Sequence, residues 1–120
     1  MSFYDNFKNP RAEYRGKPFW SWNGALDTKE IRRQVRIFKR MGMGGAFLHS
    51  RVGLATEYLG DAWFKAIRAA IAECNLEGME AWLYDEDCWP SGYAGGKVTE
   101  NPDYRRRRRG MEALPAEGGH

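Results

Sequence analysis

The sequence has few cysteines and no long apolar run. Cys74 and Cys88 are the only two cysteines among 120 residues, and their spacing suits neither a metal site nor a disulfide framework. No apolar stretch approaches the roughly 18 residues of a membrane span, and the first residues lack the basic and apolar regions of a signal peptide. We therefore expect a cytoplasmic protein with no membrane partner.

The excess of positive over negative charge comes from one run of residues. The formal net charge is +3, but five of the nineteen basic residues form Arg105–Arg109, and the remaining fourteen are outnumbered by sixteen acidic residues. A nucleic-acid-binding protein normally spreads basic residues over a binding face. We expect no nucleic-acid partner, and we expect residues 105–120 to form a basic, poorly structured tail.

What the chain does contain is an alternation of strand and helix patterns. Short apolar runs, rich in aromatic residues, predict strands at residues 18–24, 44–49 and 80–84. A helix is predicted from Asp27 to just before Gly42, because Asp27 and Glu30 resemble a capping box and Gly42 can adopt the left-handed conformation that ends helices. Its apolar stripe consists of Ile31, Val35 and Phe38.

The second predicted helix spans residues 61–77 and ends at Gly78. Its predicted stripe is Phe64, Ile67 and Ile71, widened by Trp63, Ala66 and Ala70. The resulting β-α-β-α-β order is typical of an α/β fold with a parallel sheet. Residues 1–17 are predicted to be a leading segment and residues 18–104 to hold the three β/α units.

Each predicted strand ends in residues capable of binding a ligand. In parallel α/β sheets and barrels, ligands bind at the carboxyl ends of the strands. Every one of these ends also has a plain structural explanation. Trp20 and Trp22 fit either a core position or a sugar-stacking platform, with at most one expected to point into a site, and His49 fits either a satisfied buried position or a ligand contact beside Arg51.

The third strand end carries three adjacent carboxylates, at residues 85–87. They fit a solvated loop, but adjacent like charges repel, which favours a role in binding hydroxyls or a metal, or in acid–base chemistry. Strand alternation predicts that Asp85 and Asp87 share one face and that Glu86 joins Trp82 and Tyr84 on the other. Cys88 fits a structural role better than a nucleophile. The glycine-rich stretch 91–96 is not followed by the Lys-Ser/Thr pair of a phosphate loop and contains no G-x-G-x-x-G pattern, so phosphate binding there is not expected.

Three segments resemble glycoside hydrolases of family 106, the α-L-rhamnosidase-like enzymes. They are residues 18–23, residues 44–54 and residues 81–92, and the resemblance extends over residues 17–104. It implies that the chain is the N-terminal part of a (β/α)₈ TIM-type barrel, truncated after three β/α units. The substrate-binding residues predicted from the strand ends and the resemblance together are Trp22, Asn23, His49, Arg51, Asp85, Glu86, Asp87 and Trp89.

The resemblance also implies an inverting hydrolysis by two carboxylates, a general acid and a general base. Both belong to later strands of the family, so we expect no catalytic residue in this chain and no required cofactor, although calcium is plausible in the full-length parent. We expect the chain alone to be inactive and unstable, and to associate with the remainder of the barrel or with itself, because a parallel sheet needs both faces covered. The alternatives are a non-catalytic carbohydrate-binding α/β unit and, less favoured, an open α/β domain that binds phosphate.

Overall fold

Three short strands and two longer helices alternate along the chain. The computed structural model describes residues 2–88, 91–107 and 110. The strands are β1 (Phe19–Trp22), β2 (Gly45–Ser50) and β3 (Glu80–Leu83), and the helices between them are α2 (Thr28–Arg40) and α3 (Asp61–Leu76). The predicted β-α-β-α-β order is confirmed, with boundaries within a few residues of those expected.

The sheet has the order β1-β2-β3, and both strand pairs are parallel. Its register places Phe19, Phe47 and Trp82 in one row across the sheet. Backbone pairing continues past the ends of the strands, because the Arg51 amide donates to the Trp22 carbonyl and the Tyr84 amide to the Leu48 carbonyl. The carboxyl ends of all three strands therefore meet at one edge, in an arrangement compatible with part of a β/α barrel.

Helix α2 begins and ends close to the predicted residues. The Asp27 carboxylate accepts a hydrogen bond from the Glu30 amide at 2.8 Å, as an N-cap should. The reciprocal half of the capping box is missing, because the Glu30 carboxylate instead accepts hydrogen bonds from Arg33 and Gln34. These bonds lower the pKa of Glu30 to about 2. Gly42 follows the helix at a φ of 81°, which is the predicted left-handed conformation.

Helix α3 buries most of its predicted stripe, but not Phe64. Phe64, predicted to lie on the central stripe, is 41% exposed, whereas Trp63 is buried. The physical reason is a hydrogen bond of 2.7 Å from the Trp63 indole N–H to the Ser50 hydroxyl, which fixes that ring against the sheet. Small side chains then bring the helix close to the strands, so the buried face of α3 consists of Trp63, Ala66, Ile67, Ala69, Ala70, Glu73 and Cys74.

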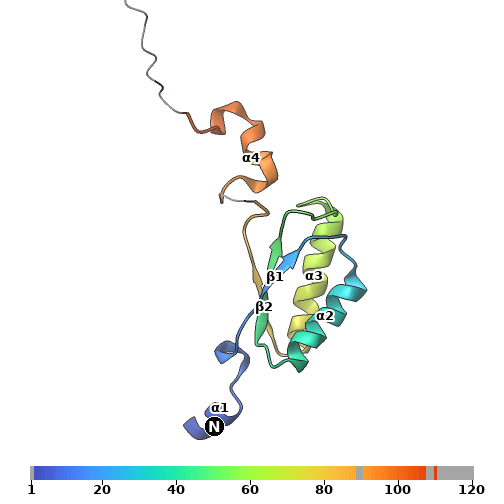
Figure 1. Cartoon of the computed structure of the whole chain (residues 1–120), viewed down its shortest axis with the longest axis vertical. Coiled ribbons are helices and arrows are strands. Elements are labelled where there is room, and N and C mark those ends of the chain that lie inside the picture. The colour runs from blue at the N-terminus through green and yellow to red at the C-terminus, as the bar shows by residue number, and fades with distance from the viewer. Residues whose placement is uncertain (1, 89–90, 108–109, 111–120) are drawn as a thin grey trace, which may run out of the picture.

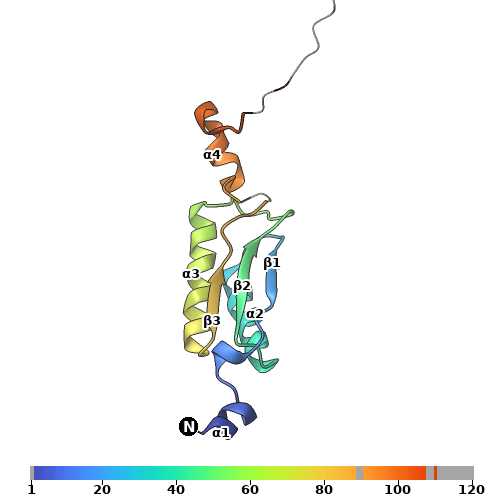
Figure 2. The same ribbon diagram turned by 90° about the vertical axis from the view of Figure 1, so that its left-hand side faces the viewer.

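Both long helices cover the same face of the sheet (Figures 1 and 2). The core between them consists mainly of Trp20, Trp22, Ile31, Val35, Ala46, Leu48, Trp63, Ala66, Ile67, Ala70, Cys74 and Met79. On the other face, Phe19 and Trp82 remain 49% and 48% exposed, and no helix among the described residues lies across it. We call this surface the open face; its aromatic row is Phe19, Phe47 and Trp82.

Short elements occupy both ends of the described chain. The leading segment holds helix α1 (Phe3–Lys8) and a 3-10 turn (Ala12–Tyr14), neither of which the sequence predicted. Past the sheet lie 3-10 turns at Ala94–Gly96 and Pro102–Tyr104 on either side of helix α4 (Lys97–Glu100), at the opposite end of the molecule from α1 (Figure 1). Of the predicted basic tail, only residues 105–107 and 110 belong to the described chain, and all of them are exposed. No described helix is both long and apolar enough to cross a membrane.

Candidate functional site

The centre of the candidate site is His49, near the carboxyl end of β2. Its ring lies between two aromatic rings, with centroids 4.4 Å from Phe19 on β1 and 4.3 Å from Tyr84 just past β3. The residue is only 6% exposed. Its Nδ1 atom is buried and has no hydrogen-bond partner within the described part of the chain. Residues on or next to three neighbouring strands therefore surround one imidazole with a free polar atom.

The surroundings of His49 favour its neutral form. Burial lowers the pKa of the ring, the positive charge of Arg51 lowers it further, and the carboxylate of Asp87 opposes the effect. Arg51 lies next to the same aromatic wall, with its guanidinium carbon 5.8 Å from the centre of the Phe19 ring. At neutral pH the imidazole is therefore uncharged, with one nitrogen that donates and one that accepts a hydrogen bond.

The three carboxylates that follow β3 have different environments. Asp85 is exposed, Glu86 is only 4% exposed, and Asp87 is half-buried. The predicted alternation fails for Asp87, which lines the same hollow as Glu86. The reason is that regular strand structure ends at Leu83, so side chains beyond it no longer alternate between the two faces of a sheet.

These residues surround a hollow of about 460 Å³ at the carboxyl edge of the sheet, which we call the rim hollow. Two polar atoms of its lining residues, His49 Nδ1 and Asp87 Oδ1, are buried without a hydrogen-bond partner among the described residues. Unsatisfied buried polar atoms are costly, so such groups indicate a place for a bound molecule or water. The residues that line the rim hollow are Phe19, His49, Arg51, Val52, Tyr84, Glu86, Asp87 and Cys88.

The structure does not bring every predicted residue to this hollow. Trp22 is 3% exposed and belongs to the core under the helices. Trp20 belongs to the same core, because residues two apart on a strand face the same way, so neither tryptophan points into the rim hollow. Asn23 is exposed and lines a separate hollow of about 210 Å³ beside α2. Asp85 lies outside the rim hollow, and Trp89 lies outside the described residues.

Several rim residues were missed from the sequence. Phe19 and Tyr84 form the walls around His49; their signal was strand parity, which places Phe19 opposite to Trp20. Tyr58 does not line the rim hollow, but its hydroxyl donates to the Asp85 carbonyl. Burial together with the charges of the neighbouring acids raises the pKa of Tyr58. Cys88 lines the hollow, and partial desolvation together with Asp87 raises the pKa of its thiol. A protonated thiol agrees with a structural role for Cys88 rather than a nucleophilic one.

The rim hollow by itself offers few ligands to the calcium ion that the resemblance made plausible for the full-length parent. No group of three or more His, Cys, Asp or Glu side chains is arranged to hold a metal ion within residues 2–88, 91–107 and 110. Both carboxylate oxygens of Glu86 already accept backbone hydrogen bonds. Asp87 then remains as the one carboxylate of the rim hollow, among the described residues, with an oxygen available to ligate a metal ion.

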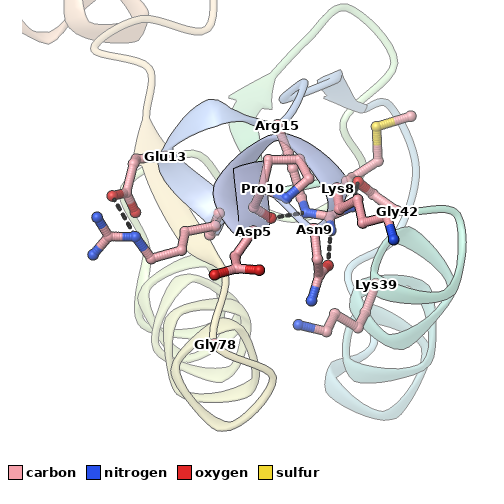
Figure 3. A pocket seen from close by; sticks show the side chains of 12 residues that line it. Asp5, Lys8, Asn9, Pro10, Glu13, Arg15, Lys39, Gly42 and Gly78 are labelled. Atoms are coloured by element: carbon pink, nitrogen blue, oxygen red, sulfur yellow. Dashed lines mark hydrogen bonds and ion pairs between the residues drawn. The ribbon is translucent and has the colours of Figure 1, made fainter. Parts of the chain in front are cut away.

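A larger hollow, about 960 Å³, lies at the amino ends of the strands (Figure 3). The cation at its centre, the Arg15 guanidinium, already forms hydrogen bonds within the protein. It donates to the Pro10 and Gly42 carbonyls and to the side chain of Asn9. At this end of the sheet such bonds anchor the leading segment, whereas ligands of parallel α/β folds bind at the carboxyl ends. We therefore take the smaller rim hollow as the candidate site.

No protein-family model matches the chain, and no curated protein matches it. Among solved structures, the chain is similar to a rhamnosidase from Novosphingobium sp. PP1Y, with 26% sequence identity and a TM-score of 0.60. The similarity covers 75% of this chain and 9% of that enzyme. The chain therefore has a rhamnosidase-like fold that corresponds to a small part of the length of that enzyme.

Proposed function

We propose that the rim hollow binds a sugar and that the chain forms part of the substrate pocket of a glycoside hydrolase of the α-L-rhamnosidase-like family 106. The observation that carries this proposal is the pair of buried, unpartnered atoms in one hollow, His49 Nδ1 and Asp87 Oδ1. The similarity to a rhamnosidase supports the same substrate class.

The chemistry of the hollow suits a polyhydroxylated ligand. A carboxylate oxygen accepts hydrogen bonds, and the imidazole nitrogen donates or accepts one according to its tautomer. A sugar hydroxyl does both, so adjacent hydroxyls can satisfy the two atoms together. The guanidinium of Arg51 adds several donors nearby, and the rings of Phe19 and Tyr84 offer apolar surface to the C–H groups of a sugar.

The chain is proposed to bind sugar without cleaving it. Inverting glycosidases need two carboxyl groups, roughly 6.5–9.5 Å apart, on opposite sides of the bond that breaks. In the rim hollow the oxygens of Glu86 bond to backbone amides, which leaves Asp87 as the free carboxylate. The general acid and base are therefore proposed to lie on other strands, outside this chain. Taken by itself, the chain is a non-catalytic carbohydrate-binding unit.

The open face is proposed to be covered in the working protein. Parallel sheets occur almost only with both faces buried, and here an aromatic row is half exposed. Further β/α units of a barrel would cover it, and in their absence self-association would do so. No membrane or nucleic-acid partner is proposed, and a cytoplasmic location remains our proposal.

The test is calorimetric titration of the 120-residue chain with L-rhamnose. Because the open hollow offers the sugar few hydrogen bonds, we expect a Kd on the order of 1 mM, which corresponds to a binding free energy of about −4 kcal/mol. Asp87→Asn removes the charged acceptor and should weaken binding about tenfold, since hydrogen bonds to charged groups contribute roughly 1.5–3 kcal/mol.

Asn23→Ala is the matched control, because Asn23 lines a different hollow, and it should leave the affinity unchanged. Incubation with an aryl rhamnoside should release no product. Equal affinities of the Asp87→Asn variant and the unaltered chain would contradict the proposed site. Hydrolysis by the chain would contradict the proposed absence of a catalytic pair.

A further inference from the structure

Glu86 differs from its two acidic neighbours in that its bonding capacity is used inside the protein. Its Oε1 atom accepts hydrogen bonds from the amides of Gly92 and Ala94, and its Oε2 atom accepts a second contact from Ala94 at 2.9 Å. Charge-assisted bonds of this kind are stronger than neutral ones. The buried carboxylate is therefore satisfied by the backbone of residues 92–94 and needs no ligand.

The same stretch of chain is held from its other side by Tyr58. Gly95 has a φ of 62°, and a Cβ atom placed on it would lie 2.9 Å from the Tyr58 ring. The Tyr58 hydroxyl in turn donates to the Asp85 carbonyl at 3.3 Å. Tyr58 belongs to the loop after β2, whereas Glu86 and Gly95 follow β3, so these contacts join the two loops that border the rim hollow.

We propose that Glu86 is a positioning residue, which fixes residues 92–96 against Tyr58 and thereby sets the place of Asp87, and that Asp87 alone among the three carboxylates contacts the ligand. This inference rests on the proposed sugar-binding function and deepens it. It narrows the prediction that all three acids of residues 85–87 contact substrate. Asp85 is exposed and outside the hollow, Glu86 bonds to the backbone, and only Asp87 keeps a buried, unpartnered oxygen there.

Three nearly isosteric variants separate these roles: Asp85→Asn, Glu86→Gln and Asp87→Asn. The first measurement is amide hydrogen exchange at Gly92 and Ala94 without any sugar. A fourth variant, Glu86→Ala, removes the charged acceptor that holds both amides. It should speed their exchange about tenfold, which corresponds to about 1.4 kcal/mol. Glu86→Gln should give an intermediate increase, and the two Asp→Asn variants should give none.

The second measurement distinguishes positioning from contact. On titration of the unaltered chain with L-rhamnose, the carboxyl ¹³C resonance of Asp87 should shift, while that of Glu86 should stay in place. Gly95→Ala leaves Glu86 intact but pushes the segment away from Tyr58, so it should weaken sugar binding as Glu86→Ala does. The double variant that combines Glu86→Ala with Gly95→Ala should bind sugar no more weakly than either single variant, since both changes act through the same segment.

Unchanged exchange at Gly92 and Ala94 in Glu86→Ala, or a ligand-induced shift of the Glu86 resonance larger than that of Asp87, would overturn the assignment. If Glu86→Ala does not fold, Glu86→Gln gives the same exchange test with a smaller expected change. Failure of the unaltered chain to bind sugar would refute the proposed function, whereas the exchange measurement needs no sugar and judges the positioning role separately.

Discussion

The ion cluster between the two long helices provides a quantitative test of the fold. Glu73 on α3 is 6% exposed, and its two carboxylate oxygens accept hydrogen bonds from Arg32 at 3.0 Å and Arg36 at 2.5 Å, both on α2. Burial alone would raise the pKa of Glu73, but the two bonds outweigh it and the pKa is lowered. The perturbation is to remove the arginines singly and together.

The expected magnitudes follow from exposure. The side chains of Arg32 and Arg36 are 39% and 46% exposed, so each pair is screened and each single Arg→Ala change should cost only about 0.5–1 kcal/mol. Removing both leaves a buried carboxylate without a partner, which costs about 3 kcal/mol. The double variant should therefore lose more than the two single variants combined.

Urea unfolding at low protein concentration measures these differences. A double variant whose loss equals the sum of the single losses would refute the reasoning, because the two arginines would then act independently. A total loss below about 1 kcal/mol would also refute it, because Glu73 would then need no partner. Acid provides a second check. Since the folded pKa of Glu73 is lowered, its stabilising contribution is present above the unfolded pKa and disappears as pH falls through the folded value. Glu73→Gln should remove that part of the acid destabilisation.

Two further predictions concern the rim hollow and the open face. The pKa of His49 is lowered by burial and by Arg51, so the imidazole of the unfolded chain is protonated at a higher pH than that of the folded chain. The free energy of unfolding should therefore fall as pH drops below about 6.5. The melting temperature of His49→Gln should depend less on pH between 7 and 5 than that of the unaltered chain, and an equal dependence would contradict the buried, neutral ring. Trp82→Lys places a charge in the aromatic row of the open face and should reduce the sedimentation-velocity mass of the chain towards that of a monomer, whereas Asn23→Ala should not. A monomeric unaltered chain at all concentrations would contradict self-association.

Most of the fold follows from local sequence patterns. The caps at Asp27 and Gly42, the stripe of α2 and the spacing of three apolar runs give the elements, their order and their parallel pairing. The exposure of Phe64 on α3 does not follow, because a tertiary hydrogen bond from Trp63 to Ser50 places the neighbouring Trp63 ring against the sheet instead. The short elements of the leading segment bury no side chains in a core, so no periodicity marks them.

The site was predictable as an edge of the sheet but not as a set of side chains. His49, Arg51, Glu86 and Asp87 come together as the carboxyl-end rule predicts. Trp22 does not join them, because its position on β1 makes its side chain face the helices, where it is part of the core. The different roles of residues 85–87 depend on where β3 ends and where the backbone of residues 92–94 returns, and no local pattern encodes that return. Strand parity places Phe19 on the face opposite to Trp20, but its contact with His49, like that of Tyr84, depends on how the strands pair.

The most direct test of the proposed sugar site is a map of the ¹H–¹⁵N and side-chain resonances that move when L-rhamnose is added to the chain. The proposed site predicts saturable shifts centred on His49, Tyr84 and Asp87, with none at Asn23 or around Arg15. Shifts centred on the hollow at the amino ends of the strands, or no saturable shift at any residue, would contradict it.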